Sequence, residues 1–113
     1  MRYLLLIYEN ENNPTPDEAE MAKWFAYTEA LREAGIHLAG EALHPTSAAT
    51  TVRVKSGDTV ATDGPFAETR EQLGGFYMIE ADDLDVAIEW AAKMPNAHKG
   101  SIEIRPIMEF DQA

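Results

Sequence analysis

The chain has 113 residues, no cysteine, and nine basic against twenty acidic residues, which give a formal net charge of −11 at pH 7. This length allows one hydrophobic core, so we predict a single domain over residues 1–113. The acidic charge disfavours binding to nucleic acid and to anionic membranes, both of which attract basic patches. No apolar run approaches the ~20 residues that span a bilayer. The lack of cysteine excludes disulfides and thiolate chemistry, and a cytoplasmic location is expected.

The first half of the chain predicts a strand, a helix and a second strand. The continuous apolar run at residues 3–8 is typical of a strand that is buried on both faces. In the helix that follows, Thr15 is the predicted N-cap, Glu18 completes a capping box, and Gly35 ends the helix. Residues 36–43 predict the second strand. Residues at helical spacing define the predicted buried side of the helix: Met21, Trp24, Phe25, Thr28 and Leu31.

The second half predicts a hairpin, a loop, a strand, a helix and a last strand. In chain order these elements occupy residues 50–55 paired with 59–62, then 63–73, 76–80, 83–94 and 101–107. Residues 56–58 are a typical hairpin turn, and one helical turn could begin at Pro65 in the loop. Asp82 or Asp83 caps the second helix, and Pro95 stops it. The predicted core stripe of this helix comprises Leu84, Ala87, Ile88 and Ala91.

This order of elements places the chain in the α+β class. It corresponds to a ferredoxin-like βαββαβ protomer with an extra hairpin strand, in which two helices cover one face of an antiparallel sheet. Residues 3–8 and 76–79 are nevertheless apolar on both faces, whereas a sheet with one face in water should alternate apolar and polar residues. A second copy that packs sheet against sheet would cover the other face, so we expect a homodimer. An unrelated partner chain is the alternative.

One long motif carries a family resemblance. Residues 63–71, with the sequence DGPFAETRE, and QLGGFY at residues 72–77 closely resemble the signature of the DGPF-domain proteins, within the YCII-related family. Four further segments fit the same pattern: residues 4–8, 40–43, 51–54 and 100–106. The resemblance implies a dimeric α+β barrel of ferredoxin-like protomers and no particular reaction. It also implies an alternative function, a regulatory or protein-interaction module linked to an extracytoplasmic-function sigma factor.

The resemblance makes Asp63 a catalytic candidate. In the wider YCII group a histidine in the first helix and an aspartate are proposed as an active pair, but this chain has no histidine between Met1 and Ile36. Asp63 would need a raised pKa or a basic partner to act as a base, and Arg53 on the preceding strand would instead keep it ionised. The motif itself favours a structural turn, because Gly64 before proline is biased toward extended backbone and Asp63 can accept backbone N–H groups.

Alternation along the strands predicts a polar cluster on the face that a dimer would enclose. His37 and Glu41 are expected to share a strand face, and Arg53 and Arg105 to project from the same side of the sheet. With Asp63 as the catalytic candidate, the predicted ligand-binding residues are His37, Glu41, Arg53, Tyr77 and Arg105. A cavity between two sheets with a few polar groups is typical of a small-molecule site. Ion pairs across the dimer interface are the alternative interpretation.

No metal site and no cofactor site are predicted. On a strand, His37 and Glu41 would stand ~13 Å apart because each residue rises ~3.3 Å, so they cannot hold one ion together. Gly74 and Gly75 precede a strand rather than a helix, so no phosphate-binding loop is expected. The sequence therefore predicts a homodimer that binds a small molecule, with chemical transformation of that molecule left open.

Overall fold

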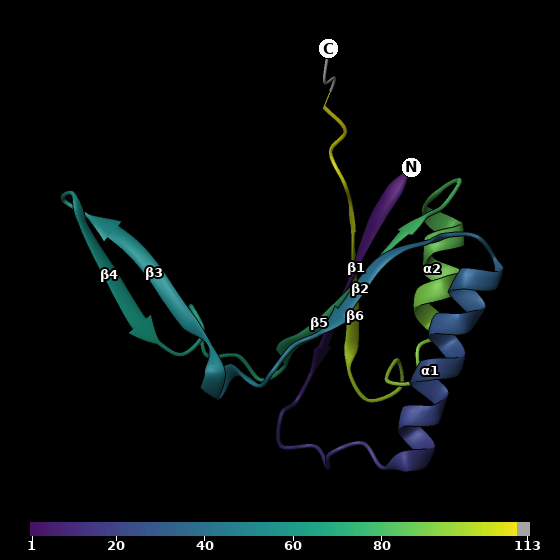
Figure 1. Ribbon diagram of the computed structural model, residues 1–113, viewed down its shortest axis with the longest axis horizontal. Helices are drawn as coiled ribbons and strands as arrows, with labels where there is room; N and C mark the ends of the chain where they lie inside the picture. The colour runs from purple at the N-terminus through teal and green to yellow at the C-terminus, as the bar shows by residue number, and fades with distance from the viewer. Residues whose placement is uncertain (111–113) are drawn as a thin grey trace.

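Four antiparallel strands form the main sheet, and two α-helices pack on one of its faces (Figure 1). The computed structural model describes residues 1–110 of the chain. The elements in this range are β1 (Arg2–Glu9), α1 (Glu18–Glu33), β2 (His37–Ala42), a short 3₁₀ turn (Thr46–Ala48), β3 (Thr50–Lys55), β4 (Asp58–Asp63), β5 (Gln72–Glu80), α2 (Leu84–Ala92) and β6 (Ser101–Pro106). The strand order β2-β5-β1-β6 is ferredoxin-like, which confirms the predicted α+β fold class.

The central strand β1 is apolar on both faces, as the sequence predicts. Tyr3 and Leu5 point toward the helices and are buried in the core with Leu31 and Ile79. Each such side chain stabilises the fold by about 1.5–3 kcal/mol when it is fully buried. The other face of the sheet carries no helix of this chain within residues 1–110, and we call it the open face. Its side chains include Leu4, Leu6, Phe76, Met78, Glu103 and Arg105.

Helix α1 begins later than the sequence analysis predicts. Asp17, not Thr15, is the N-cap, and its Oδ1 accepts a hydrogen bond of 2.8 Å from the backbone N–H of Glu20. The predicted cap was wrong because both residues are good N-caps and both precede a glutamate by three positions. Within the helix, Tyr27 and Leu31 are buried, whereas Phe25 is 68% exposed.

Helix α2 follows the prediction at its start and departs from it in its core stripe. Asp83 caps the helix by accepting a hydrogen bond of 3.0 Å from the backbone N–H of Val86. Ala87 is buried as predicted, and so is Ala91, but the predicted core residues Leu84 and Ile88 are about half exposed. Within residues 1–110 no helix is long and apolar enough to cross a membrane.

Strands β3 and β4 form a separate two-stranded sheet that projects away from the main sheet, and we call residues 50–63 the arm (Figure 1). The predicted hairpin is confirmed. Its turn has positive φ at both Ser56 (+52°) and Gly57 (+84°), which is the combination that matches the twist of two paired strands. The following loop contains no helical turn at Pro65, and β5 already begins at Gln72.

The N-cap assignment of α1 is testable by alanine substitution. Asp17→Ala removes the acceptor for the Glu20 N–H and should lower the free energy of unfolding by about 1 kcal/mol. Thr15→Ala is the matched control and should leave it nearly unchanged. Urea unfolding followed by circular dichroism measures both values. Equal losses in the two variants would contradict the assignment.

Candidate functional site

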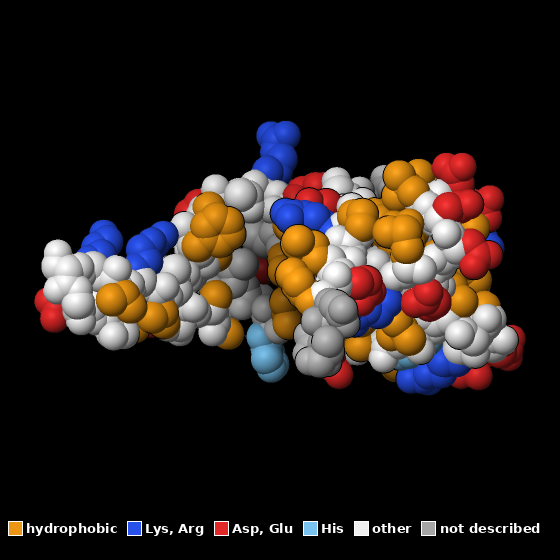
Figure 2. All heavy atoms as spheres, turned by 90° about the horizontal axis from the view of Figure 1, so that it is seen from above, with side chains coloured by type: hydrophobic (Ala, Val, Ile, Leu, Met, Phe, Trp, Pro, Cys, Tyr) orange, Lys and Arg blue, Asp and Glu red, His pale blue; other side chains and the backbone are white. Residues whose placement is uncertain are grey.

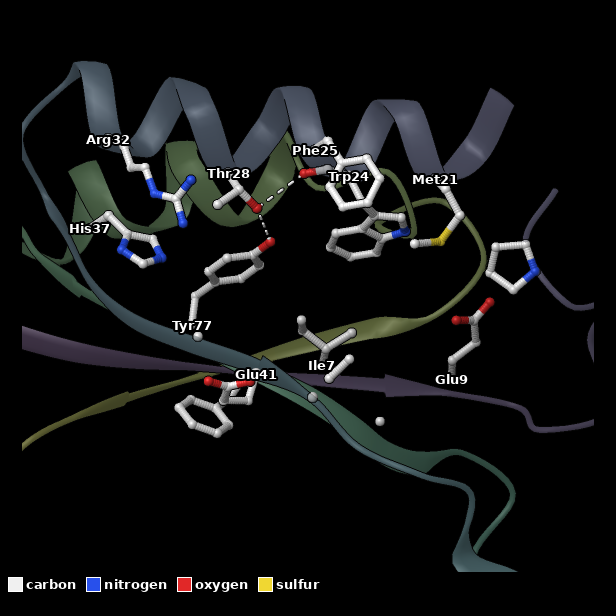
Figure 3. A pocket seen from close by; sticks show the side chains of 16 residues that line it. Ile7, Glu9, Met21, Trp24, Phe25, Thr28, Arg32, His37, Glu41 and Tyr77 are labelled. Atoms are coloured by element: carbon white, nitrogen blue, oxygen red, sulfur yellow. Dashed lines mark hydrogen bonds between the residues drawn. The ribbon is translucent and has the colours of Figure 1, made fainter. Parts of the chain in front are cut away.

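A cavity of about 380 Å³ lies between α1 and the β2–β5 side of the main sheet (Figure 3). This volume falls within the range of ordinary small-molecule sites. The walls are mainly apolar and come from both layers: Ile7, Pro16, Met21, Trp24, Phe25 and Phe76. A smaller number of polar side chains interrupts them: Glu9, Thr28, Arg32, His37, Glu41 and Tyr77. The arrangement therefore has the general composition of a ligand pocket.

A short hydrogen-bonded chain fixes the hydroxyl of Tyr77 inside the cavity. The Tyr77 hydroxyl lies 2.6 Å from Oγ1 of Thr28, and that Oγ1 donates to the carbonyl oxygen of Trp24 over 3.1 Å (Figure 3). When Thr28 directs its one hydrogen to Trp24, it accepts from Tyr77. The lone pairs of the Tyr77 oxygen then remain free to accept a hydrogen bond from a ligand.

The ring of Tyr77 is held by close packing against strand β2. A Cβ added to Gly40 would lie 2.7 Å from Cδ1 of Tyr77 and 3.0 Å from its Cε1. Such distances are far below ordinary van der Waals contact, so the ring occupies the space that a side chain at position 40 would need. Glycine at this position therefore allows the ring to lie directly against the backbone of the edge strand.

An aromatic cluster supports Tyr77 from the core side. The ring of Tyr27 packs edge-on against Tyr77 with centroids 5.4 Å apart, and against Trp24 and Trp90 at 6.4 and 6.2 Å. Tyr27 donates a hydrogen bond of 2.7 Å to the carbonyl oxygen of Trp90. Burial strongly raises the pKa of the Tyr27 phenol, so this residue is neutral and serves as a packed, hydrogen-bonded support.

One end of the cavity is basic. His37 packs edge-on against Tyr77 with ring centroids 6.0 Å apart, and Arg32 reaches toward it from the last turn of α1 (Figure 3). The guanidinium of Arg32 has only a long ion pair of 3.8 Å to Glu29, in which both side chains are about 60% exposed. Such an exposed pair is weak, so the guanidinium is available for an anionic group in the cavity.

The structure corrects the prediction that His37 and Glu41 share a strand face. A register shift between His37 and Ala39 introduces a bulge, so that His37 pairs with buried Ile79, while Glu41 pairs with Phe76 of the open face. The bulge adds one residue to β2 and reverses the alternation before it. His37 therefore faces α1, whereas Glu41 lies on the other side of the sheet and reaches the cavity only at its edge (Figure 3).

The arm carries Arg53 and Asp63 away from this cavity, and neither residue lines it. Thr50 pairs with Asp63 and Arg53 pairs with Val60, which places Arg53 and Asp63 on opposite faces of the hairpin. The two side chains therefore do not face each other, contrary to the expectation from the sequence. Strand alternation could not reveal this, because it does not specify which sheet a strand joins.

The DGPF turn is held by its glycine. Gly64 has φ of +104° rather than the predicted extended backbone, and its N–H donates a hydrogen bond of 2.8 Å to the carbonyl oxygen of Ala49. Oγ1 of Thr51 in turn donates to the carbonyl oxygen of Gly64 over 2.8 Å. These bonds tie the two ends of the arm together. The DGPF motif therefore has a structural role, because its glycine forms the hydrogen bonds that close the base of the arm.

Arg105 lies on the open face and not in the cavity. Its Nε donates a hydrogen bond of 2.8 Å to Oε2 of Glu103, and this bond lowers the pKa of the Glu103 carboxyl. The pKa of the neighbouring Tyr8 is raised, first by burial and then by the negative charge of Glu103. Glu103 and Arg105 thus form an ion pair within one strand, with the Tyr8 phenol beside it.

Of the predicted site residues, the cavity thus brings together Tyr77, His37 and, at its edge, Glu41. Sequence analysis missed Arg32, and it assigned Thr28 and Phe25 to the core of α1. A signal was present, because residues 21, 25, 28 and 32 follow one another at spacings of three or four and therefore share a helix face. Within residues 1–110, no three His, Asp or Glu side chains come together as a metal site.

The fold and cavity define a ferredoxin-like α+β protomer with a pocket between its first helix and its sheet. The chain belongs to the YCII-related domain family, whose model matches residues 1–111. It is 40% identical over 114 residues to Uncharacterized protein R00369 of Rhizobium meliloti (strain 1021), covering 95% of this chain and 92% of that protein.

A solved structure shows the same fold. It is 5-chloro-2-hydroxyhydroquinone dehydrochlorinase (TftG) from Burkholderia phenoliruptrix AC1100 in complex with 2,5-dihydroxybenzoquinone, which aligns with a TM-score of 0.59. The match covers 97% of this chain and 96% of that chain, with 15% sequence identity. At this identity the likeness is one of fold.

The close contact between Gly40 and Tyr77 is testable. Gly40→Ala should displace the tyrosine ring and lower the free energy of unfolding by about 1–3 kcal/mol, the usual cost of an overpacked site. Gly74→Ala is the matched control, since its Cβ would meet nothing nearer than 4.0 Å. Chemical denaturation measures stability, and tyrosine side-chain NMR shifts report the ring position. An unmoved ring in Gly40→Ala would contradict the packing argument.

Proposed function

We propose that this chain binds a small planar aromatic molecule that carries a hydroxyl and an acidic group, in the cavity between α1 and the β2–β5 strands. The observation that carries the proposal is the Tyr77 hydroxyl, which is hydrogen-bonded to Thr28 beside an available guanidinium. An acceptor oxygen and a cationic group at the same end of an apolar cavity define a specific kind of ligand.

The apolar walls favour an aromatic ring. Trp24, Phe25 and Met21 line the α1 side of the cavity, and Ile7 and the ring of Tyr77 line the sheet side. Aromatic side chains make favourable edge-on and offset contacts with a ring, and the methionine sulfur adds further contacts of this type. A ligand with one or two rings suits a volume of about 380 Å³.

The polar end of the cavity determines which substituents the ring of the ligand should carry. The Arg32 guanidinium can bind a carboxylate through two parallel hydrogen bonds, and such charge-assisted bonds are roughly twice as strong as neutral ones. The Tyr77 oxygen requires a donor, and a ligand hydroxyl meets this need. Proton exchange with that hydroxyl would fall to His37, which packs against Tyr77, because imidazole is the commonest general acid–base group in proteins.

The comparison with a solved structure supports the proposal. The structural neighbour TftG is described in complex with 2,5-dihydroxybenzoquinone, a small ring with hydroxyl groups. This is the type of ligand that the cavity of the present chain favours on its own chemistry. The shared fold supports a ligand site of this kind in the present chain.

The ligand proposal is tested by titration with 4-hydroxybenzoate, followed by calorimetry and by tryptophan fluorescence, since Trp24 lines the cavity. Arg32→Gln should weaken binding about tenfold or more, because a hydrogen bond to a charged group contributes about 1.5–3 kcal/mol. Tyr77→Phe should weaken it by a smaller factor.

The control is Arg53→Gln, which removes the same charge from the arm and should leave the affinity unchanged. Phenol, which lacks the acidic group, should bind the unaltered protein more weakly than 4-hydroxybenzoate. The proposal fails if neither probe binds, or if Arg53→Gln reduces affinity as much as Arg32→Gln.

The same proposal includes a homodimer in which two open faces pack together. What supports it is the row of apolar side chains on that face, with Leu6 opposite Phe76 and Leu4 opposite Met78. A sheet face of this composition favours burial against another apolar surface. An isologous pair of copies satisfies this need with one surface.

Sedimentation velocity at micromolar concentrations tests the homodimer. The unaltered chain should sediment as a dimer, and Leu6→Asp should convert it to a folded monomer because a carboxylate would be buried in the interface. Ile88→Asp is the control, as this residue is 47% exposed on α2, away from the open face. A wild-type monomer at these concentrations would remove this part of the proposal.

A further inference from the structure

The arm makes the chain larger than a compact protein of its length. Its radius of gyration is 16.3 Å, whereas a compact domain of 113 residues has about 13 Å. The principal extents are 48, 47 and 18 Å, so the molecule is flat and spread out. Residues 50–63 pair only with each other as strands and do not join the main sheet. An isolated two-stranded hairpin is at best marginally stable in water, so the arm requires a surface to pack on.

The two faces of the arm differ in chemistry. One face carries Val52, Val54 and Ala61, together with threonines and, at the base of the arm, Asp63. Val52 and Val54 are 60% and 68% exposed. The other face carries the two basic residues of the arm, Arg53 and Lys55, with Asp58 and the less exposed Val60. Figure 2 shows this division, with basic side chains along one side of the arm and hydrophobic ones along the other.

The arm also lies on a particular side of the molecule. The helices cover one side of the main sheet, and the arm projects on the opposite side, which is that of the open face (Figure 1). A strand of six residues is about 20 Å long, whereas two sheets that pack face to face are about 10 Å apart. A second sheet on the open face would therefore lie beside the arm, well within its reach.

We infer that the arm clasps a second copy of this chain, with its valine face packed against the main-sheet body of the partner. The inference rests on the homodimer proposed above and adds a second contact surface to it. Each arm would reach past the interface between the two open faces to the edge of the other copy. Val52 and Val54 would then be covered, and the face with Arg53 and Lys55 would remain in solvent.

The distribution of charge favours this contact between two acidic chains. The arm contains two basic and two acidic residues, so the net charge of −11 lies entirely outside it. On the open face, Glu103 is paired with Arg105, and Glu80 with the N-terminal amine at 2.8 Å, whereas Glu41 has no ion pair within residues 1–110. Pairing of the other two carboxylates reduces the repulsion between two copies that meet through the arm and the open face.

A pair of neighbouring substitutions tests the clasp. Val54 and Lys55 are adjacent but lie on opposite faces of the arm. In sedimentation equilibrium of the full chain at 0.2 M salt, Val54→Asp should raise the dimer dissociation constant at least 100-fold. Lys55→Asp should change it less than threefold, although it alters the charge by two units rather than one. Far-UV circular dichroism of both variants should match the unaltered chain, since the arm lies outside the core.

Crosslinking provides a second measurement. Val54→p-benzoylphenylalanine, in a mixture of ¹⁵N-labelled and unlabelled chains, should form links between copies that map to main-sheet or helix residues of the partner. The same substitution at Lys55 should form few. Links confined to the same chain, or to the partner's arm, would overturn the inference.

The outcomes separate this inference from the proposed function. A dimer that is lost in Leu6→Asp but unaffected by Val54→Asp would overturn the clasp and leave the homodimer in place. A wild-type monomer would overturn both. Binding of 4-hydroxybenzoate is measured separately, so its presence or absence decides the ligand proposal alone.

Discussion

The two-sided hydrophobicity of β1 is the constraint on which the rest of the structure depends. The side that carries Tyr3 and Leu5 is buried under both helices and forms the core. The side that carries Leu4 and Leu6 is equally apolar, but both helices lie on the opposite side of the sheet. One helix layer covers only one of the two apolar surfaces of the sheet. The cavity lies under this layer, and the other surface remains as the open face, on whose side the arm projects. This division also explains why the candidate ligand site lies within one protomer.

The binding site depends on two close contacts that link the helix layer to the sheet. Gly40 allows the ring of Tyr77 to lie against the edge strand, and Thr28 on α1 forms a hydrogen bond with the tyrosine hydroxyl. Tyr27 supports that ring from the core and is kept neutral by its burial. The acceptor oxygen of the site is therefore positioned by the hydrophobic core. A ligand would meet a largely preformed arrangement, which lowers the entropic cost of binding.

Local sequence signals predicted the elements with local causes. The apolar run of β1, the Asp83 cap and the hairpin turn at Ser56 and Gly57 each depend on a few neighbouring residues, and all three are confirmed. The Thr15 cap failed because Asp17 offers the same chemistry two residues later. The ferredoxin-like order was also predictable, since element order restricts the possible sheets.

The candidate site was predicted less well because it depends on pairing over long distances in the chain. A stripe of apolar residues on α1 was interpreted as core, although its outer members Met21 and Phe25 line a cavity that ends at Arg32. The placement of Arg53 required knowledge that its hairpin does not join the main sheet. Neither fact is encoded in the spacing of residues along one element.

The bulge in β2 has a consequence for how such a pocket can change over evolutionary time. Leu38 occupies an extra position in an edge strand, so no further strand of the main sheet has to accommodate it. The orientation of the imidazole at position 37 is thus set by strand length and not by the identity of any pocket residue. Loss of the bulge would reverse the faces of the residues before it and put Leu38 in place of His37 toward the cavity, while Gly40 kept its contact with Tyr77. Ligand preference in this fold can accordingly shift through backbone slippage at its rim, without a substitution inside the cavity.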